Sequence, residues 1–317
     1  MASRALLITG ATGKQGGSVI KALLEADAPF EILALTRNAQ SASAQRLLKQ
    51  SPKIKLVTGD FSAIDDVFRT AKEAASAPIW GVFSVQVSQI TALRISSNHT
   101  NLHAQAVGKN EEPEGKRLVD AAIANQVSHF VYTSADRGVN ADSDPTVVPH
   151  FITKFNIEQH LMTKTPTSNM SWSILRPVAF FDNLTPDFFG KVFGSSMEVL
   201  GKKLQMIATS DIGWFAAHAF LKADQEEYKN KSIGLAGDEL NFAEMKSVFE
   251  QKTGESLPTT YAFVAKLIQW LAHDFGTMFK WFSTNGFSVD IAGLRKRNPD
   301  MQDFRTWLET ESAWKKT

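Results

Sequence analysis

The chain has 317 residues, enough to bury one large core with an appended lobe, and its 43% hydrophobic and 21% charged residues are typical of a globular protein. A formal net charge of +1 provides no general attraction to nucleic acid or to an anionic membrane surface. The chain contains no cysteine, which excludes disulfides, zinc–thiolate sites and a cysteine nucleophile, and we expect no metal site.

The start of the chain shows no targeting signal, because the apolar run at residues 5–9 is too short for one and leads directly into a glycine motif. The most apolar later stretch, residues 261–287, is interrupted by polar and charged side chains. We interpret it as a buried amphipathic element rather than a membrane span. We therefore expect no membrane contact and a cytoplasmic location, or a nuclear one if the protein is a regulator.

Six short runs rich in β-branched residues predict strands at residues 5–9, 31–36, 54–58, 79–85, 130–134 and 172–175. The segments between them have helical periodicity, as at Val19, Ile20 and Leu23. Strands with little alternation, separated by helices, predict a parallel sheet covered on both faces. The expected fold of residues 1–176 is therefore a Rossmann-type, doubly wound α/β domain.

After Pro177 the pattern changes, because aromatic residues become dense and strand patterns become rare. Asp211 predicts the N-cap of a helix from Ile212 to about Lys222. Asn241 predicts the cap of another helix, which ends before Gly254. We expect residues 177–317 to form a smaller, mostly helical lobe over the carboxyl ends of the strands, where a substrate pocket would lie.

A glycine motif, Gly10-Ala-Thr-Gly13-Lys-Gln-Gly16, follows the first predicted strand and opens a helix. Gly10 would permit a tight turn, Gly13 a close approach of the backbone to a pyrophosphate, and Gly16 close packing of helix on strand. The helix N-terminus would then bind the phosphates. The motif predicts a dinucleotide-binding site.

The second strand ends at Thr36-Arg37-Asn38, where NAD-specific folds usually carry an acid for the ribose 2′-OH. Arg37 can instead bind a 2′-phosphate, so we expect NADP(H). The alternative is a solvated arginine on a polar loop. Asp60 and Phe61 follow the third strand and are expected to border the adenine, although a helix N-cap explains Asp60 nearly as well.

Ser134 closes the fifth predicted strand at its carboxyl end, the side on which such sheets bind ligands, and His150-Phe-Ile-Thr-Lys154 leads into the next helix. We predict Lys154, His150 and Ser134 as catalytic residues. Lys154 would bond the nicotinamide ribose and, if desolvated, serve as an acid or base. His150 lies one turn earlier on the same side of the helix, and a capping or packing role explains it equally well.

The predicted cofactor-binding set comprises Gly10, Thr12, Gly13, Lys14, Gln15, Gly16, Arg37, Asn38, Asp60, Phe61, Val85, Lys154, Pro177 and Phe180. A polar segment at about residues 88–112 fits neither half of the chain. It is either a surface insertion or a lid near the cofactor.

The motifs that form a joint pattern are Gly10-Ala-Thr-Gly-Lys-Gln-Gly-Gly17, Thr36-Arg37-Asn38, Gly59-Asp60, His150-Phe-Ile-Thr-Lys154, Leu175-Arg-Pro-Val-Ala-Phe-Phe-Asp-Asn183, Ser210-Asp-Ile-Gly213 and Phe304-Arg-Thr-Trp-Leu308. In this pattern the chain resembles the NmrA-like family, which consists of atypical short-chain dehydrogenase/reductase proteins. The resemblance covers nearly the whole chain except the polar segment after Val87.

The resemblance implies one of two functions. Some members of the family are NADPH-dependent reductases, which would imply a hydrophobic carbonyl, imine or enone substrate here. Others are NADP(H)-responsive regulators that bind a protein partner, so a non-catalytic redox sensor is the alternative. The family lacks the usual Tyr-x-x-x-Lys acid, and in this chain His150 stands where that tyrosine would be. The resemblance leaves Lys154 as the acid/base candidate.

Overall fold

The computed structural model describes residues 4–86 and 110–315. The polar segment expected at about residues 88–112 lies almost entirely outside the described residues, so both interpretations of it stay predictions. A helix begins at Glu111.

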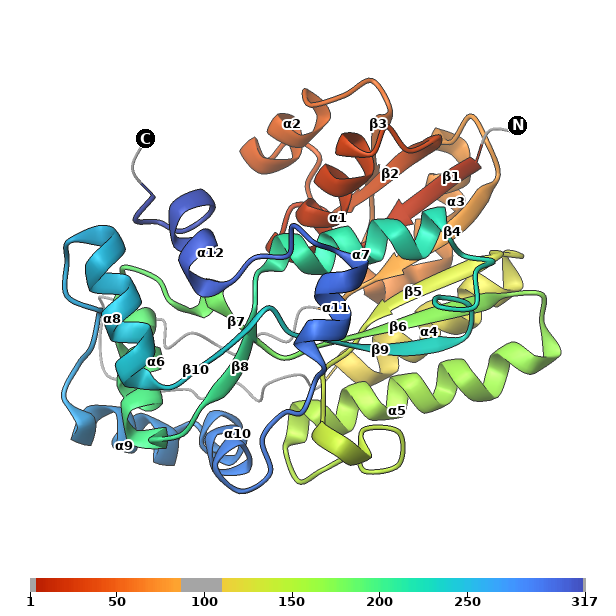
Figure 1. The fold of residues 1–317 in the computed structure, drawn as a ribbon. Helices are drawn as coiled ribbons and strands as arrows, with labels where there is room; N and C mark the ends of the chain where they lie inside the picture. The colour runs from red at the N-terminus through yellow and green to blue at the C-terminus, as the bar shows by residue number, and fades with distance from the viewer. Residues whose placement is uncertain (1–3, 87–109, 316–317) are drawn as a thin grey trace, which may run out of the picture.

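A seven-stranded parallel sheet forms the centre of the molecule (Figure 1). Its strands are β1 (Arg4–Ile8), β2 (Phe30–Thr36), β3 (Ile54–Thr58), β4 (Ile79–Ser84), β5 (His129–Thr133), β6 (Ser171–Pro177) and β9 (Lys231–Leu235), in the order β3-β2-β1-β4-β5-β6-β9. The strand order reverses between β1 and β4, which is where ligands bind in open sheets of this kind. The predicted Rossmann-type, doubly wound fold is confirmed.

Helices cover both faces of the sheet. Successive side chains along each strand point to opposite faces, so the apolar strands bury side chains on both sides. Leu6 and Ile8 pack into one core, which also includes residues of the helices α1 (Lys14–Glu25), α2 (Ala42–Leu48) and α7 (Thr209–Leu221). Ala5 and Leu7 pack into the other core, with the helices α3 (Ile64–Ala74), α4 (Glu111–Ala124) and α5 (Pro149–Lys164).

A third core fills the lobe formed mainly by the second half of the chain, on the left in Figure 1. Its helices are α6 (Phe188–Leu200), α8 (Phe242–Thr253), α9 (Ala262–Leu271), α10 (His273–Thr284) and α12 (Phe304–Thr310). A small sheet in the order β10-β8-β7 joins them, made of β7 (Ala179–Phe180), β8 (Leu204–Ile207) and β10 (Asp238–Leu240). Helix α11 (Ile291–Arg297) packs instead through Leu294 on the core of the large sheet.

The chain returns from this second half to the large sheet. Helix α7 packs along α1, where a Cβ on Gly213 would lie 2.5 Å from the carbonyl of Ser18, and β9 pairs with β6. The division at residue 176 stays a prediction, and these two elements show that residues after it complete the Rossmann core.

Two of the predicted helix caps have different outcomes. Asn241 caps α8 in a capping box with Glu244, and Gly254 ends that helix in the left-handed conformation, as predicted. The prediction for Asp211 is wrong, because α7 begins at Thr209 after Ala208. Asp211 lies in the first turn, where it is buried and its Oδ2 accepts a hydrogen bond from the backbone N–H of Gln302.

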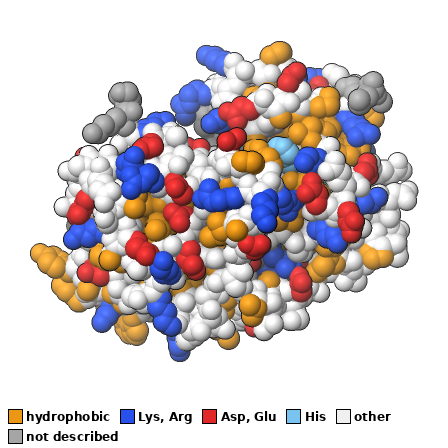
Figure 2. All heavy atoms as spheres, viewed as in Figure 1, with side chains coloured by type: hydrophobic (Ala, Val, Ile, Leu, Met, Phe, Trp, Pro, Cys, Tyr) orange, Lys and Arg blue, Asp and Glu red, His pale blue; other side chains and the backbone are white. Residues whose placement is uncertain are grey.

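The stretch predicted as one buried amphipathic element forms two helices with different environments. Helix α10 is buried through Phe275, Phe279 and Trp281. Helix α9 exposes Phe263, Leu267 and Trp270 at 69%, 50% and 77%, so the prediction is wrong for α9. Hydrophobic side chains project at the lower left of Figure 2, where Figure 1 places α9. Within the described residues, every helix is too short or too polar to cross a membrane.

The close contact between α7 and α1 predicts that Gly213→Ala lowers the free energy of unfolding. The added methyl group would overlap the backbone of Ser18, and overpacking of this kind costs about 1–3 kcal/mol. Gly17→Ala is the matched control, because its Cβ would lie 3.5 Å from the carbonyl oxygen of Ala11, an ordinary contact. Urea denaturation measures both. Equal stability of the Gly213 variant and the wild type would contradict the contact.

Burial of Asp211 predicts a pH-dependent stability. Burial raises the pKa of this carboxyl from 3.8 to about 7 in the folded protein. The folded state therefore binds more protons than the unfolded state between these values, and stability falls as pH rises from about 4 to 7, by up to about 1.4 kcal/mol per pH unit. Asp211→Asn should remove this slope while its amide oxygen still accepts the Gln302 hydrogen bond. Denaturation series at several pH values test this, and an unchanged slope would contradict it.

Candidate functional site

The glycine motif forms a tight turn between β1 and α1. Gly10 has a φ of +57°, and a Cβ there would lie 2.6 Å from the Val85 side chain. A Cβ on Gly16 would lie 2.3 Å from the carbonyl oxygen of Gly10, so Gly16 allows the helix to pack on the strand end. Val85 is held at the end of β1, because its N–H donates to Oγ1 of Thr9, the residue after this strand, at 2.8 Å.

The N-terminus of α1 presents unpaired donors. Gly13 is the N-cap, no side chain caps the helix, and its first turn contains no acidic residue. Among the described residues, the backbone N–H groups of Lys14, Gln15 and Gly16 have no hydrogen-bond acceptor. Gly13 and Thr12 are exposed beside them. A helix start of this kind attracts an anion through its free N–H groups and its dipole.

Two side chains of the motif connect α1 to other parts of the carboxyl edge. Lys14 Nζ donates to the carbonyl oxygen of Asp182 at 3.0 Å and lies 3.3 Å from that residue's carboxylate. Gln15 Oε1 accepts from Thr133 Oγ1, at the end of β5, at 2.7 Å. The predicted residues Pro177 and Phe180 lie nearby in sequence to Asp182, with Pro177 buried at the end of β6 and Phe180 half-buried in β7.

Arg37 follows β2 and is exposed. Within the described residues its guanidinium makes no hydrogen bond or ion pair. Asn38 closes the turn, because its Oδ1 accepts from the N–H of Gln40 at 2.8 Å. Asp60 accepts from the N–H of Ser62 as the N-cap of a 3-10 turn, η1 (Phe61–Ala63). This hydrogen bond, and to a lesser extent the charge of Arg37, holds the pKa of Asp60 below its usual value.

Ser134 lies just beyond β5, in a segment fixed by buried charges. Its N–H donates to the carbonyl oxygen of Leu175 at 2.7 Å, and its hydroxyl lies 3.4 Å from Arg137 Nη1. Arg137 and Arg176 both bind the carboxylate of Glu158, with Nη2–Oε2 distances of 2.7 Å each. The side chains of Arg137 and Glu158 are fully buried.

His150 lies in the first turn of α5, after Pro149, which suits the first position of a helix. Its Nδ1 lies 2.9 Å from Asp274 Oδ1, in the first turn of α10. The rings of Phe151 and Trp281 pack edge to face at 5.4 Å beside this contact. The His150 and Asp274 side chains are only 10% and 12% exposed, so the pair lies at the boundary between the two halves of the chain.

Lys154 lies one turn further along α5. Its ammonium is 2.8 Å from Glu111 Oε1, at the start of α4, and its side chain is 12% exposed. The Glu111 carboxylate also accepts from Thr153 Oγ1 at 3.2 Å. Sequence reasoning placed Lys154 in the site but missed the buried carboxylate that partners it.

None of the three tyrosines replaces the tyrosine of the Tyr-x-x-x-Lys pattern. Tyr132 is fully buried, and burial raises the pKa of its hydroxyl well above the usual value. Tyr228 is also buried, and Tyr261 is an exposed residue at the N-cap of α9. The ionisable side chains in the first two turns of α5 are those of His150 and Lys154.

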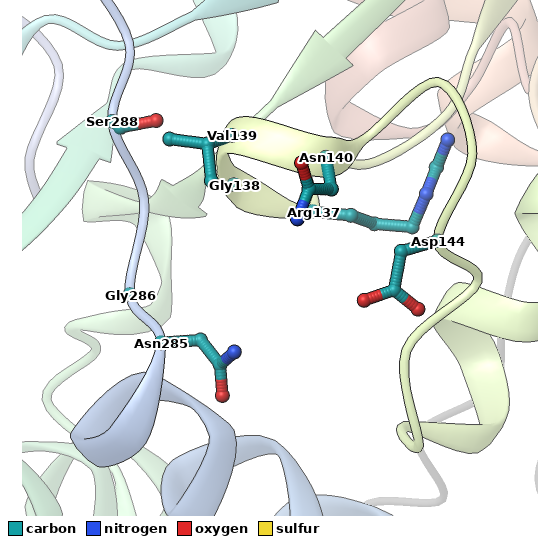
Figure 3. Close-up of a pocket in the computed structure, with 8 residues that line it drawn as sticks. All are labelled: Arg137, Gly138, Val139, Asn140, Asp144, Asn285, Gly286 and Ser288. Atoms are coloured by element: carbon teal, nitrogen blue, oxygen red, sulfur yellow. The ribbon is translucent and has the colours of Figure 1, made fainter.

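A small cavity of about 90 Å³ lies between the loop after β5 and the loop after α10 (Figure 3). Asn140, Asp144, Asn285 and Ser288 are among its lining residues. The guanidinium of Arg137 points away from the gap, consistent with its bonds to Glu158. Ser134, His150 and Lys154 do not line this cavity.

The structure thus brings the predicted residues to one edge of the sheet, while their roles toward a cofactor or substrate stay predictions. Residues that sequence reasoning missed are Glu111, Arg137, Glu158, Arg176 and Asp274. Only Arg176 lay in a recognised motif, and it forms part of a buried ion network rather than an exposed site.

The sequence model of the NmrA-like family matches residues 2–306. An NmrA-like family domain-containing oxidoreductase of Aspergillus hancockii is 26% identical over 80% of this chain and 73% of its own. Another, of Penicillium ochrochloron, is 29% identical over 51% of this chain, and this match spans only 44% of that protein's length.

Solved structures with the same fold include proteins of both functional kinds. An NADPH-dependent quinone oxidoreductase of Escherichia coli, complexed with NADPH, has a TM-score of 0.68 at 18% identity, covering 96% of this chain and 97% of its own. A Citrobacter triphenylmethane reductase complexed with NADP(H) has a TM-score of 0.65 at 19% identity, covering 96% and 98%. NmrA, described as a negative transcriptional regulator and complexed with NADP, has a TM-score of 0.62 at 15% identity, covering 98% and 95%.

Proposed function

The chain belongs to the NmrA-like family, and from this premise we propose that it is an NADPH-dependent reductase of a hydrophobic small molecule with a carbonyl, imine or enone group. The observation that carries the proposal is the exposed Arg37 guanidinium, without a partner among the described residues, at the same sheet edge as the uncapped N-terminus of α1. The guanidinium is positively charged and the helix N-terminus carries a partial positive charge, so both can bind an anion.

These residues fit a dinucleotide phosphate. The free N–H groups of Lys14, Gln15 and Gly16 suit a pyrophosphate, and Arg37 suits a 2′-phosphate because its forked donors match phosphate oxygens. The carboxyl end of β2 lacks the acid that would bind a ribose 2′-OH, because residues 36–38 are Thr, Arg and Asn. When bound, NADPH would supply the hydride.

The ionisable residues of α5 favour a reductase. The Lys154 amine group is mostly buried beside the Glu111 carboxylate, where it can donate to ribose hydroxyls and stabilise negative charge on a substrate. The two fungal relatives are named oxidoreductases, which supports a reductase. The partner we expect is therefore a small molecule, with no direct contact to nucleic acid or membrane.

The second candidate function is a non-catalytic NADP(H) sensor. Its specific support is the exposed apolar face of α9, formed by Phe263, Leu267 and Trp270, which a protein partner can cover. The cofactor site would be the same in both functions. Turnover separates them.

Arg37→Ala should weaken NADPH binding by about ten- to a hundredfold and leave NADH binding nearly unchanged, because charge-assisted bonds to a phosphate contribute about 1.5–3 kcal/mol. Arg46→Ala, at an exposed arginine of α2, is the matched control. Titration calorimetry with both cofactors measures the effect. Equal affinity of the wild type for NADPH and NADH would refute the assignment.

Lys154→Met should reduce turnover far more than NADPH affinity in an enzyme, because the stem remains and the charge is lost. In a sensor, only NADPH binding should weaken. Lys164→Met, at the exposed end of α5, is the control. Steady-state NADPH oxidation and calorimetry are compared, with thermal denaturation to check that the altered contact with Glu111 leaves the protein folded. Unchanged turnover would remove Lys154 from the mechanism.

A further inference from the structure

We propose that His150 delivers the proton in the reduction, from its Nε2, and that Asp274 is the positioning residue that holds the imidazole for this step. The inference rests on the proposed reductase function. Asp274 belongs to the second half of the chain, so this half would position a catalytic residue.

The tautomer of His150 follows from the geometry. His150 Nδ1 lies 2.9 Å from Asp274 Oδ1, and a carboxylate at this distance accepts a hydrogen bond. Nδ1 therefore carries the hydrogen. Among the described residues, Nε2 has no hydrogen-bond partner and is the ring nitrogen left for a substrate. This arrangement, a carboxylate that orients an imidazole by its Nδ1–H, is how histidine is prepared for proton transfer.

Asp274 is held in place from several directions. The backbone N–H of His150 lies 3.5 Å from the same Oδ1, so Asp274 also lies at the N-terminus of α5, where the helix dipole favours a negative charge. The ring contact between Phe151 and Trp281 keeps α10 against α5. The carboxylate is thus a rigid partner for the imidazole rather than a mobile surface charge.

The other candidate donors at this edge are less suitable. The Lys154 ammonium lies 2.8 Å from the Glu111 carboxylate, which is 1% exposed. Giving up the proton would remove the counter-charge of a buried anion, which is costly. Tyr132 is fully buried and cannot reach a ligand. When the doubly protonated His150 ring gives up its Nε2 proton, its Nδ1–H still donates to Asp274. That carboxylate is 12% exposed, against 1% for Glu111, so the charge left on it is better hydrated.

At a carbonyl substrate, the carbon gains a hydride and forms a C–H bond, the C=O π bond breaks, and the oxygen takes the Nε2 proton of the doubly protonated His150 ring, which is left as the neutral Nδ1–H form. The net reaction consumes NADPH and one proton and gives NADP⁺ and an alcohol. A cationic triphenylmethane dye differs, because its central carbon gains the hydride and becomes neutral without any proton. Proton delivery is therefore required for one acceptor and not for the other.

This difference provides the test. The wild type, His150→Phe and Asp274→Asn are assayed with NADPH against two acceptors, 9,10-phenanthrenequinone and crystal violet. Phe keeps the ring packing on Phe151, and Asn keeps an acceptor for the backbone N–H of His150. The matched control is Asp120→Asn, because Asp120 of α4 pairs with His160 of α5 at 2.8 Å in an exposed contact.

We expect kcat with the quinone to fall by about 10²–10⁴-fold in His150→Phe, with little change in KM, and by a smaller factor in Asp274→Asn. Turnover of crystal violet should stay at the wild-type level in both. In the His150→Phe background, Asp274→Asn should have no additional effect, because Asp274 acts through His150. Equal losses with both acceptors, or no loss with the quinone, would overturn the proposal, as would a wild type that reduces only the dye.

A spectroscopic measurement keeps the inference separate from the proposed function. If the wild type reduces neither acceptor, the proposed reductase function fails. Nitrogen-15 spectra of histidine-labelled protein, at a pH where the ring is neutral, still report the tautomer. The Nδ1–H form in the wild type, lost or mixed in Asp274→Asn, supports the positioning role of Asp274. The Nε2–H form in the wild type overturns it.

Discussion

The carboxyl edge of the sheet depends on one buried carboxylate. Glu158 lies on α5 and accepts four hydrogen bonds from Arg137 and Arg176, which follow β5 and end β6. Removing one member of such a buried network leaves an uncompensated charge, at a cost of about 3–5 kcal/mol. The network therefore fixes α5 relative to two strands. His150 and Lys154 take their positions from that helix.

The same helix meets the second half of the chain through the His150–Asp274 pair and the Phe151–Trp281 contact. Together with α7 and β9, which complete the Rossmann core, these contacts mean that the two halves are not independent units. A substrate bound over α5 would touch residues positioned by both. Substitutions in α10 should therefore alter the position of His150, although α10 is remote in sequence from the glycine motif.

Local signals were sufficient for part of this picture. The turn at Gly10 and Gly16 and the caps of α8 depend on neighbours within a few residues, so sequence patterns predict them. The N-cap prediction for Asp211 is wrong because an aspartate before a helical pattern can be either a capping residue or a buried acid of the first turn. What decides is its contact with Gln302, 91 positions away. The partner of His150 is 124 positions away, and no periodicity reports it.

Helix α9 shows the complementary failure. Its sequence is mostly apolar, interrupted by Lys266 and Gln269, which predicts burial of one face; Ala265 is buried, but Phe263 and Trp270 are exposed. Periodicity gives the faces of a helix but not how many of them have a partner within the same chain. Whether a second molecule covers this face depends on the function, which the helix pattern does not contain.

Energetic cost is the strongest argument for chemistry at α5. Partly buried pairs such as Lys154–Glu111 and His150–Asp274 lose hydration, and well-packed apolar residues in their place are often equally or more stabilising. Cofactor binding alone would use the α1 turn, Arg37 and Lys154, but it does not need the His150–Asp274 pair. A fold that only sensed NADP(H) would gain little from a carboxylate that orients an imidazole whose Nε2 has no hydrogen-bond partner among the described residues. A reductase of a carbonyl group can use both, because hydride transfer raises negative charge on the substrate oxygen, which an ammonium group stabilises and a protonated imidazole neutralises.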